Sequence, residues 1–254
     1  MNNLRIINGY LLNENSFPEN EFERLYISLR KKEGRIFTEK EICKLPNVSK
    51  NNPHFKEWKI RKNSCNKLLK YVKQKGHVCS ILEIGCGNGW LSAQLSEITK
   101  GEVTGIDINR NELAQAKKVF ASKRNLNFIA ADIRNGIPGD KKFDLIVFAA
   151  SIQYFKSLNE IINISLRHLT LQGEIHILDS HFYLPVKIFL ARQRTKKYFS
   201  EIGFPEMAGY YFHHSIRELK SFNYKVLHNP HSWMNKISFR KNPFYWIIIK
   251  NFCR

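Results

Sequence analysis

No stretch of this 254-residue sequence is long and apolar enough to cross a membrane. A spanning helix needs about 20 consecutive apolar residues. The opening segment, MNNLRIINGYLLNEN, carries one basic residue and soon turns polar, so we expect no signal peptide. Apolar and aromatic residues nevertheless make up 43% and 13% of the chain. A chain of this size and composition can bury a substantial core.

Cysteine is scarce, and the sequence contains no C-x-x-C pair. The five cysteines are Cys43, Cys65, Cys79, Cys86 and Cys253. Their odd number and scattered spacing argue against a disulfide framework and against structural zinc, and they favour a reducing, cytoplasmic location. Two adjacent histidines, His213 and His214, resemble a metal site only superficially, because neighbouring side chains diverge and no third ligand is indicated. We therefore expect no metal.

A dinucleotide-binding fingerprint is also absent, although a glycine-rich run stands in a suitable place. In the run ILEIGCGNGWL, Glu83 ends an apolar stretch, and three glycines follow at alternate positions, Gly85, Gly87 and Gly89. The G-x-G-x-x-G pattern fails because Trp90 occupies its third glycine position. A strand end followed by a glycine turn and a helix still lets backbone N–H groups approach a ligand. The run therefore predicts a nucleotide-like cofactor.

The observed pattern, E-x-G-x-G-x-G, resembles the first motif of the class I S-adenosylmethionine-dependent methyltransferases. The resemblance implies that the glycine loop passes under the methionine part of S-adenosylmethionine and that Glu83 helps to hold its amino group. Cys86 lies inside this loop, where a small side chain is required, and we favour that role over a reactive one. The alternative is a glycine turn that only lets strand and helix pack.

Two more acidic residues follow at the ends of later apolar runs. Asp107 ends the run VTGID and follows Gly89 by 18 residues, about where a carboxylate can take both ribose hydroxyls. Asp132 lies in FIAADI; the resemblance implies that it accepts from the adenine amino group, while the backbone N–H of Ile133 serves the ring. The predicted S-adenosylmethionine-binding residues are Glu83, Gly85, Cys86, Gly87, Gly89, Asp107, Ile108, Asp132, Ile133 and Ala149.

Apolar runs alternate with helical stretches along the chain, which favours an α/β fold. We predict a Rossmann-like open twisted sheet, mostly parallel, with an antiparallel last strand as the resemblance implies. The first strand is expected from Val78 to about Glu83, and further strands near residues 103–108, 128–133, 143–150 and 173–179, with two late ones at 224–227 and 244–249. Residues 77–254 would form the methyltransferase domain, in which residues 181–214 are a substrate lid.

Residues 1–76 are predicted to be a helical N-terminal cap. A helix over 18–32 should end at Gly34, and Thr38 with Glu41 forms a capping box for a second, short helix. A longer helix is expected over 54–75, closed by Gly76, with the first strand starting at Val78. The resemblance implies that such helices cover the active site; a dimerisation or packing element is the alternative.

Basic residues are concentrated on the two flanks of the chain. Residues 1–76 hold 17 lysines and arginines against 8 acidic residues, residues 77–180 hold 11 of each, and residues 181–254 hold 13 against 3. A basic surface can attract nucleic acid, anionic membrane or small acidic substrates. The alternative is a compositional bias toward lysine in an Asn- and Ile-rich chain.

Methyl transfer needs mainly alignment of the acceptor with an already activated methyl group, plus a general base where the acceptor carries a proton. Tyr154 follows the fourth predicted strand. The resemblance implies that this position lies close to the methyl-bearing end of the cofactor, so Tyr154 is predicted to shape the acceptor site. His181, after the fifth strand, is the predicted base, and His214 is the second choice.

Several acceptor classes lack their signatures. After the fourth predicted strand the sequence reads AASIQYF, where methyltransferases that modify the amino groups of bases have an N/D-P-P-Y/F motif. No cysteine for carbon-5 methylation stands there. The paired glutamates of protein arginine methyltransferases are missing as well. We therefore favour an O or N acceptor on a small molecule, with an RNA-modifying methyltransferase as the second choice. A non-catalytic binding module is a third alternative, disfavoured by the joint presence of Glu83, Asp107 and Asp132. The sequence leaves the oligomeric state open.

Overall fold

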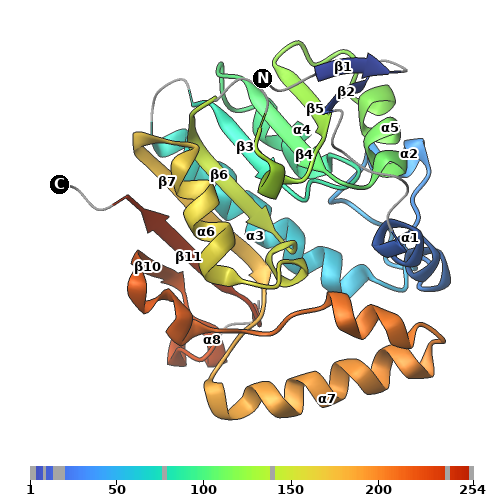
Figure 1. The fold of residues 1–254 in the computed structure, drawn as a ribbon, viewed down its shortest axis with the longest axis vertical. Coiled ribbons are helices and arrows are strands. Elements are labelled where there is room, and N and C mark those ends of the chain that lie inside the picture. The colour runs from blue at the N-terminus through green and yellow to red at the C-terminus, as the bar shows by residue number, and fades with distance from the viewer. Residues whose placement is uncertain are drawn as a thin grey trace.

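A computed structural model describes residues 4–7, 10–13, 21–75, 79–137, 141–237 and 241–251, in which helices flank one large sheet (Figure 1). The strands are β1 (Leu4–Ile7), β2 (Tyr10–Asn13), β3 (Ile81–Ile84), β4 (Val103–Asp107), β5 (Leu126–Ala130), β6 (Phe143–Ala149), β7 (Leu169–Ser180), β8 (Phe182–Tyr183), β9 (His214–Ser215), β10 (Asn223–His228) and β11 (Tyr245–Lys250). The α-helices are α1 (Glu21–Lys32), α2 (Glu39–Ile42), α3 (Phe55–Gln74), α4 (Trp90–Ser96), α5 (Arg110–Val119), α6 (Leu158–Arg167), α7 (Pro185–Glu201) and α8 (Trp233–Ile237). The 3₁₀-helices are η1 (Ile133–Asn135), η3 (Ile152–Tyr154), η4 (Pro205–Tyr210) and η5 (Ile216–Ser221).

The strands of the large sheet follow the order β1-β2-β5-β4-β3-β6-β7-β11-β10. Strands β3 to β7 pair in parallel, whereas β11 pairs antiparallel with both β7 and β10. The predicted mostly parallel sheet with an antiparallel last strand is therefore confirmed. The chain runs from β3 outward through β4 and β5, then returns to the other side of β3 at β6. The carboxyl ends of strands at such a reversal form a crevice.

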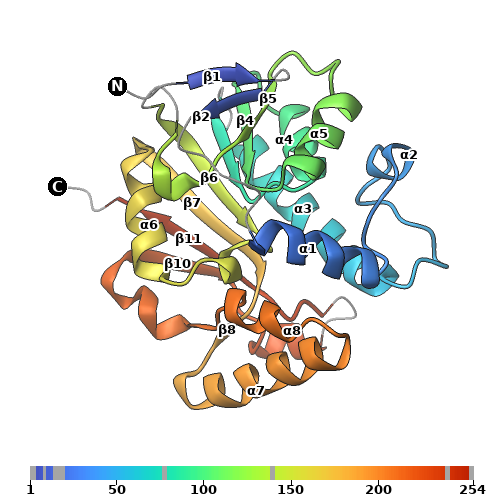
Figure 2. The same cartoon turned by 45° about the vertical axis from the view of Figure 1, so that its right-hand side comes forward.

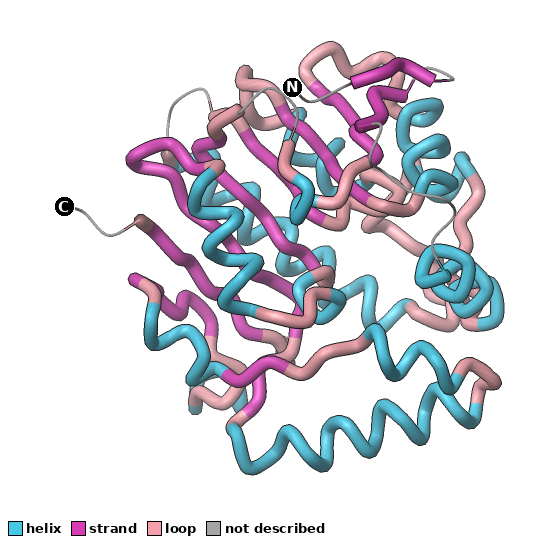
Figure 3. Tube along the Cα trace, viewed as in Figure 1, coloured by secondary structure: helices cyan, strands magenta, loops and turns pink. Residues whose placement is uncertain are grey.

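Both faces of the central strands are buried, as expected for parallel strands covered by helices. Leu145 and Val147 of β6 pack with residues of α3, α4 and α5, whereas Ile146 and Phe148 pack with residues of α6. Figures 1 and 3 show α6 in front of the sheet and α3 behind it. Because side chains alternate along a strand, Glu83 of β3 points to the face that carries α4.

The N-terminal helix α1 and the segment after β7 meet each other (Figure 2). Leu29 of α1, Phe199 of α7 and Met207 of η4 form a separate apolar cluster. Two phenols reinforce this contact, since Tyr198 donates to Glu33 at 2.5 Å and Tyr210 donates to Glu21 at 3.1 Å. The segments predicted to be a cap and a lid therefore touch.

Some local predictions are confirmed and others need correction. The Thr38–Glu41 capping box is present, and Gly34 has a φ of +67° just after α1. The third predicted strand is shifted: β5 ends at Ala130, so Asp132 lies in the loop beyond it and caps η1. The expected α-helix after residue 215 is the 3₁₀-helix η5.

The hairpin of β1 and β2 is not predicted by the sequence, because four-residue strands are too short to show a clear alternation. It extends the sheet beyond β5 through the pairing of Leu12 with Ala130. The predicted helix end at Gly76 and strand start at Val78 lie outside the described residues, as do the start of the first predicted helix and Cys253. No helix in the described part of the chain has the length and apolar character that crossing a bilayer requires.

A buried charge network joins β7, β11 and the end of α3. Glu174 is 2% exposed, and its carboxylate pairs with Lys250 at 2.8 Å and Lys75 at 3.2 Å. It also accepts from Tyr71 at 2.8 Å and contacts His176 at 3.2 Å. Against the effect of burial, these hydrogen bonds and charges hold the pKa of Glu174 well below its usual range. The carboxylate thus stabilises the fold above the unfolded-state pKa, and this contribution is lost as the pH falls.

We expect Glu174→Ala to lower the free energy of unfolding by about 2 kcal/mol, because it removes the carboxylate that hydrogen-bonds to the buried His176 and to Tyr71. Glu102→Ala is the matched control: its ion pair with Lys141 is exposed, so the change should stay within about 0.5 kcal/mol. Urea denaturation at pH 7 measures both. Equal effects of the two substitutions would contradict a stabilising role for the network.

Candidate active site

A cavity of about 490 Å³ lies at the carboxyl ends of β3, β4 and β6. Loops after these strands form one part of its wall, and α1, α3 and the segment around η4 form the rest. The predicted cofactor-binding residues that line it are Glu83, Gly85, Cys86, Gly87, Asp107, Ile108, Asp132, Ile133 and Ala149. The predicted S-adenosylmethionine site is thus brought together in one cavity, except for Gly89.

The glycine loop is shaped by packing as well as by access to a ligand. Gly85 has a φ of +75°, and a Cβ atom at this position would lie 2.5 Å from the Cβ of Ser151. Ser151 in turn donates to the backbone oxygen of Ile84 at 2.6 Å, which joins the loops after β3 and β6. Gly89, with a φ of +73°, has the ring of Phe128 where its own side chain would be. Gly89 therefore lies against the core and outside the cavity lining.

Asp107 supports the glycine loop directly. The backbone N–H of Gly87 donates to its Oδ2 at 2.7 Å, and that of Asn109 donates to its Oδ1 at 2.8 Å. Burial raises the pKa of Asp107, while these two N–H donors oppose the rise. Each carboxylate oxygen can accept a second hydrogen bond, so the group can hold the loop and bind two ribose hydroxyls.

Two other acids share this part of the cavity. Burial raises the pKa of Glu83 to about 8, although Ser92 donates to the carboxylate at 2.5 Å, and the charge of Asp107 adds to the rise. Burial and Asp107 likewise raise the pKa of Glu112 to about 7. Asn109 donates to Glu112 at 2.9 Å. A cationic ligand would relieve this crowding of buried acids, and S-adenosylmethionine carries a sulfonium.

Asp132 is buried and holds its own turn. It accepts from the backbone N–H of Arg134 at 2.9 Å and pairs with the guanidinium of the same residue. That guanidinium is half exposed, so it can move if the carboxylate binds an adenine amino group. Ile133 follows in η1 and lines the cavity.

Cys86 is buried, and burial beside Asp107 raises the pKa of its thiol well above the usual value, which supports a packing role.

Of the three predicted catalytic residues, only Tyr154 lines the cavity. The ring of His181 stacks at 4.6 Å from that of Phe244, and burial lowers the pKa of this histidine. His214 is buried, with its Nε2 3.2 Å from the backbone oxygen of Ile152, and burial lowers its pKa as well. Neither histidine is among the described residues that line the cavity.

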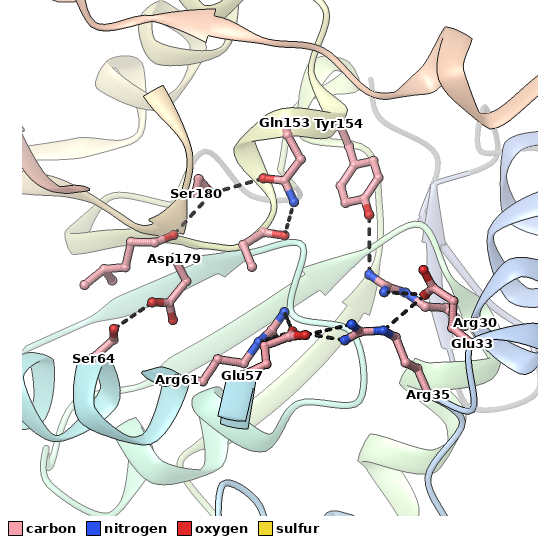
Figure 4. A network of polar contacts seen from close by, with 12 residues as sticks. Arg30, Glu33, Arg35, Glu57, Arg61, Ser64, Gln153, Tyr154, Asp179 and Ser180 are labelled. Carbon is pink, nitrogen blue, oxygen red and sulfur yellow. Dashed lines mark hydrogen bonds and ion pairs between the residues drawn. The ribbon is translucent and has the colours of Figure 1, made fainter. Parts of the chain in front are cut away.

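Three arginines of another part of the wall are joined by two glutamates into a chain of alternating charges (Figure 4). This arginine–glutamate chain consists of Arg30, Glu33, Arg35, Glu57 and Arg61. Its contacts are Arg30–Glu33 at 3.1 Å, Arg35–Glu33 at 3.2 Å, Arg35–Glu57 at 2.7 Å and Arg61–Glu57 at 3.0 Å. Against the effect of burial, Arg35 and Arg61 lower the pKa of Glu57 to about 2. The chain therefore joins the end of α1 to α3, and its central carboxylate, Glu57, stays ionised.

Strained backbone marks the cavity where β6 and β7 end. Ala150 and Asp179 both line it, and they have φ values of +56° and +52°. Such strain in residues other than glycine persists only where the surroundings enforce it, and it is frequent at functional sites. Ser64 of α3 donates to the carboxylate of Asp179 at 2.6 Å. Burial raises the pKa of Asp179 to about 6, against the effect of Ser64.

The sequence contained only weak signals for these additional residues. Glu57 and Arg61 are four positions apart, which is a common pairing on any helix surface. Arg30, Glu33 and Arg35 stand in the segment LRKKEGR, which reads as a basic helix end. Their meeting depends on how α1 packs against α3, and no local pattern encodes that.

An open α/β sheet with a glycine loop after its first central strand, and acids after the next two, defines a class I S-adenosylmethionine-dependent methyltransferase. The comparisons agree. The model of the methyltransferase domain family matches residues 75–221, and the chain belongs to this family. It is an enzyme that uses S-adenosylmethionine.

The similarity to individual proteins covers a shorter part of the chain than the match to the family model. Malonyl-[acyl-carrier protein] O-methyltransferase 2 of Ilyobacter polytropus is 34% identical over 113 residues, which cover 44% of this chain and 43% of the relative. The putative methyltransferase YqeM of Bacillus subtilis is 37% identical over 84 residues, 32% of this chain and 33% of that protein. The chain thus matches less than half the length of these relatives.

Solved structures share the fold at low identity. Magnesium protoporphyrin IX methyltransferase of Synechocystis PCC 6803, crystallised with S-adenosylhomocysteine, superposes with a TM-score of 0.58. The two sequences are 13% identical, and the match covers 88% of this chain and 95% of the other. This neighbour therefore supports the fold and leaves the methyl acceptor open.

Proposed function

We propose that this enzyme transfers the methyl group of S-adenosylmethionine to an oxygen or nitrogen atom of a small molecule. The supporting observation is a single cavity that is lined both by the acids of the predicted cofactor site and by Tyr154 with the three arginines of the arginine–glutamate chain. Its volume of about 490 Å³ lies in the range typical of small-molecule sites. Relatives named malonyl-[acyl-carrier protein] O-methyltransferase favour an oxygen acceptor within this proposal.

The enzyme's residues would mainly bind and orient. S-adenosylmethionine supplies an activated methyl group, so the protein needs to align the acceptor and exclude water. Within the cavity, Asp179 is a closer candidate for holding a proton than the predicted base His181, because its carboxylate lines the wall and its pKa is about 6. The role of His181 remains a prediction.

A methyl-transfer screen tests the proposed function. The full chain would be incubated with S-adenosylmethionine labelled on the methyl group and with either a small-metabolite extract or total RNA. We expect label in small molecules and none in RNA. Label found only in RNA would favour the alternative acceptor class, in which the basic flanks bind phosphates. Calorimetry with S-adenosylmethionine, run in parallel, shows whether the enzyme is loaded.

Asp179→Asn should reduce turnover about tenfold if the carboxylate accepts a proton from the acceptor, because the amide keeps the shape but not the basicity. The reduction should be in kcat, and it should shrink below about pH 6, where Asp179 of the wild type is itself protonated and the wild-type turnover falls. His181→Gln provides the comparison: a larger loss there than in Asp179→Asn would restore His181 as the base. Steady-state kinetics with an acceptor from the screen measures both.

A further inference from the structure

Arg30 is a largely buried cation whose charge is incompletely matched. Its side chain is 19% exposed and lines the cavity. One terminal nitrogen donates to Glu33 at 3.1 Å, whereas the other donates to the hydroxyl of Tyr154 at a long 3.3 Å. The guanidinium also lies 4.7 Å from the ring centre of Tyr26. A phenol and a ring face stabilise a cation less than a carboxylate does.

The one carboxylate at this end is shared. Glu33 also contacts Arg35 at 3.2 Å and accepts from Tyr198 at 2.5 Å. Glu57 is likewise shared between Arg35 and Arg61. The arginine–glutamate chain therefore has three cations for two anions, with a cation at each end. At the other end of the chain, the charge of Arg61 acts on Asp179 and lowers its pKa against the effect of burial. Asp179 therefore offsets positive charge at the Arg61 end, and the excess positive charge is left at Arg30.

Buried charges are normally paired, because removal from water is costly. A guanidinium offers five N–H donors in a fixed plane that matches a carboxylate. Tyr154 accepts from Arg30, so its own hydroxyl hydrogen remains available to a ligand in the cavity. Figure 4 shows the Tyr154 hydroxyl directed at Arg30 from the opposite side of the network. An anionic group that approaches the two side chains from the cavity could accept from both.

We propose that the acceptor carries a carboxylate that binds to Arg30 and Tyr154; this rests on the proposed function. One uncompensated positive charge suits a singly charged group better than a doubly charged phosphate. The acids Glu83, Asp107 and Glu112 line the cofactor side of the cavity. The charge of Arg30 acts on Glu112, but the hydrogen bonds and ion pair described for Arg30 go to Glu33 and Tyr154, so a carboxylate can still reach it. Nearby rings provide an apolar surface for the rest of the acceptor: Phe22, Tyr26, Tyr154 and Tyr210.

The test compares an acid with its neutral isostere. Binding of 4-fluorobenzoate, 4-fluorobenzamide and 4-fluorophenyl phosphate to the full chain, loaded with S-adenosylhomocysteine, would be followed by ¹⁹F NMR titration. We expect the benzoate to bind about 20-fold more tightly than the amide, as hydrogen bonds between charged groups predict. Equal binding of acid and amide would overturn the proposal. Stronger binding of the phosphate would replace carboxylate by phosphate as the anion.

Variants locate the site. Arg30→Gln should reduce the preference for the acid to less than about twofold, and Arg30→Lys should restore part of it, since the charge remains without the planar fork. Arg24→Gln, which removes an exposed arginine from the same helix, should leave it unchanged. Tyr154→Phe should weaken acid binding about threefold and provides a second test if Arg30→Gln does not fold. Unchanged acid preference in both cavity variants would refute the assignment.

Measurements of cofactor binding distinguish a failure of the proposed carboxylate site from a failure of the proposed function. Calorimetry of Arg30→Gln with S-adenosylmethionine should give a Kd within about threefold of the wild type. A large loss would mean that Arg30 binds the carboxylate of the cofactor, which also overturns the proposal. If the acid binds as expected but the screen with labelled cofactor finds no methylated small molecule, the proposed function fails while the anion site stands.

Discussion

Asp107→Ala is expected to weaken S-adenosylmethionine binding at least 100-fold. The carboxylate accepts from the N–H groups of Gly87 and Asn109 and lines the cavity, and its remaining lone pairs are the predicted acceptors for two ribose hydroxyls. Each charge-assisted hydrogen bond contributes about 1.5–3 kcal/mol. The substitution removes two such bonds to the ligand and releases the glycine loop as well. Isothermal titration calorimetry with S-adenosylmethionine and S-adenosylhomocysteine measures the loss.

The control for this substitution is Glu97→Ala. Glu97 forms an ion pair with Lys123 and is more than half exposed, so its removal should change neither the Kd nor the melting temperature appreciably. Asp107→Asn would separate the two roles of the carboxylate, because the amide keeps the size of the side chain but accepts with one oxygen only. A Kd for Asp107→Ala within fivefold of the wild type would contradict the assigned ribose contact.

The cofactor half of the site could be predicted from sequence because its residues are close along the chain and fixed by strand ends. Glu83, Gly85 and Gly87 occupy one strand-to-helix turn, and Asp107 ends the neighbouring strand. Parallel strands place their carboxyl ends along one edge, so order in the sequence becomes proximity in space. The same logic predicted the central strands, whose apolar runs are buried on both faces.

The acceptor half could not be predicted in this way. Arg30 and Glu57 lie on α1 and α3, and they approach each other only because both helices pack over the cavity. The sequence favours His181 because it follows the fifth predicted strand and because histidine is the most frequent general base. The positive φ of Asp179, +52°, interrupts the strand geometry before His181. Asp179 lines the cavity, whereas His181 contacts Phe244 outside the lining.

The affinity for S-adenosylmethionine is expected to rise about 100-fold between pH 6 and pH 8. In the free enzyme Glu83 and Glu112 have pKa values of about 8 and about 7, so both are mostly protonated at pH 6. The titratable groups that interact with Glu83 are Asp107 on β4, Cys65 on α3 and Cys86 in the glycine loop. The charges of Arg30 and Arg61, in contrast, act on Glu112 and oppose the rise of its pKa. A bound sulfonium and ammonium would favour the charged carboxylates, and binding at low pH must therefore release protons.

The magnitude follows from proton linkage. A group with a free pKa of 8 that is ionised in the complex contributes about 50-fold between pH 6 and pH 8, and one with a pKa of 7 about tenfold. Their product is an upper bound of about 500-fold, because the two acids are coupled through Asp107. The same raised pKa values make the free protein less stable as the pH rises from about 4.5 to 8, since the folded state then holds more protons than the unfolded state.

Calorimetry at several pH values, in buffers of different ionisation enthalpy, measures both the affinity and the protons released. Glu83→Gln should remove most of the dependence above pH 7, because Glu83 titrates last. S-adenosylhomocysteine, which lacks the sulfonium charge, should show a shallower rise than S-adenosylmethionine. A Kd that is flat from pH 6 to 8 would mean that these acids remain protonated in the complex. Glu83 would then bind the cofactor as a neutral hydrogen-bond partner, and the predicted pairing with its amino group would be wrong.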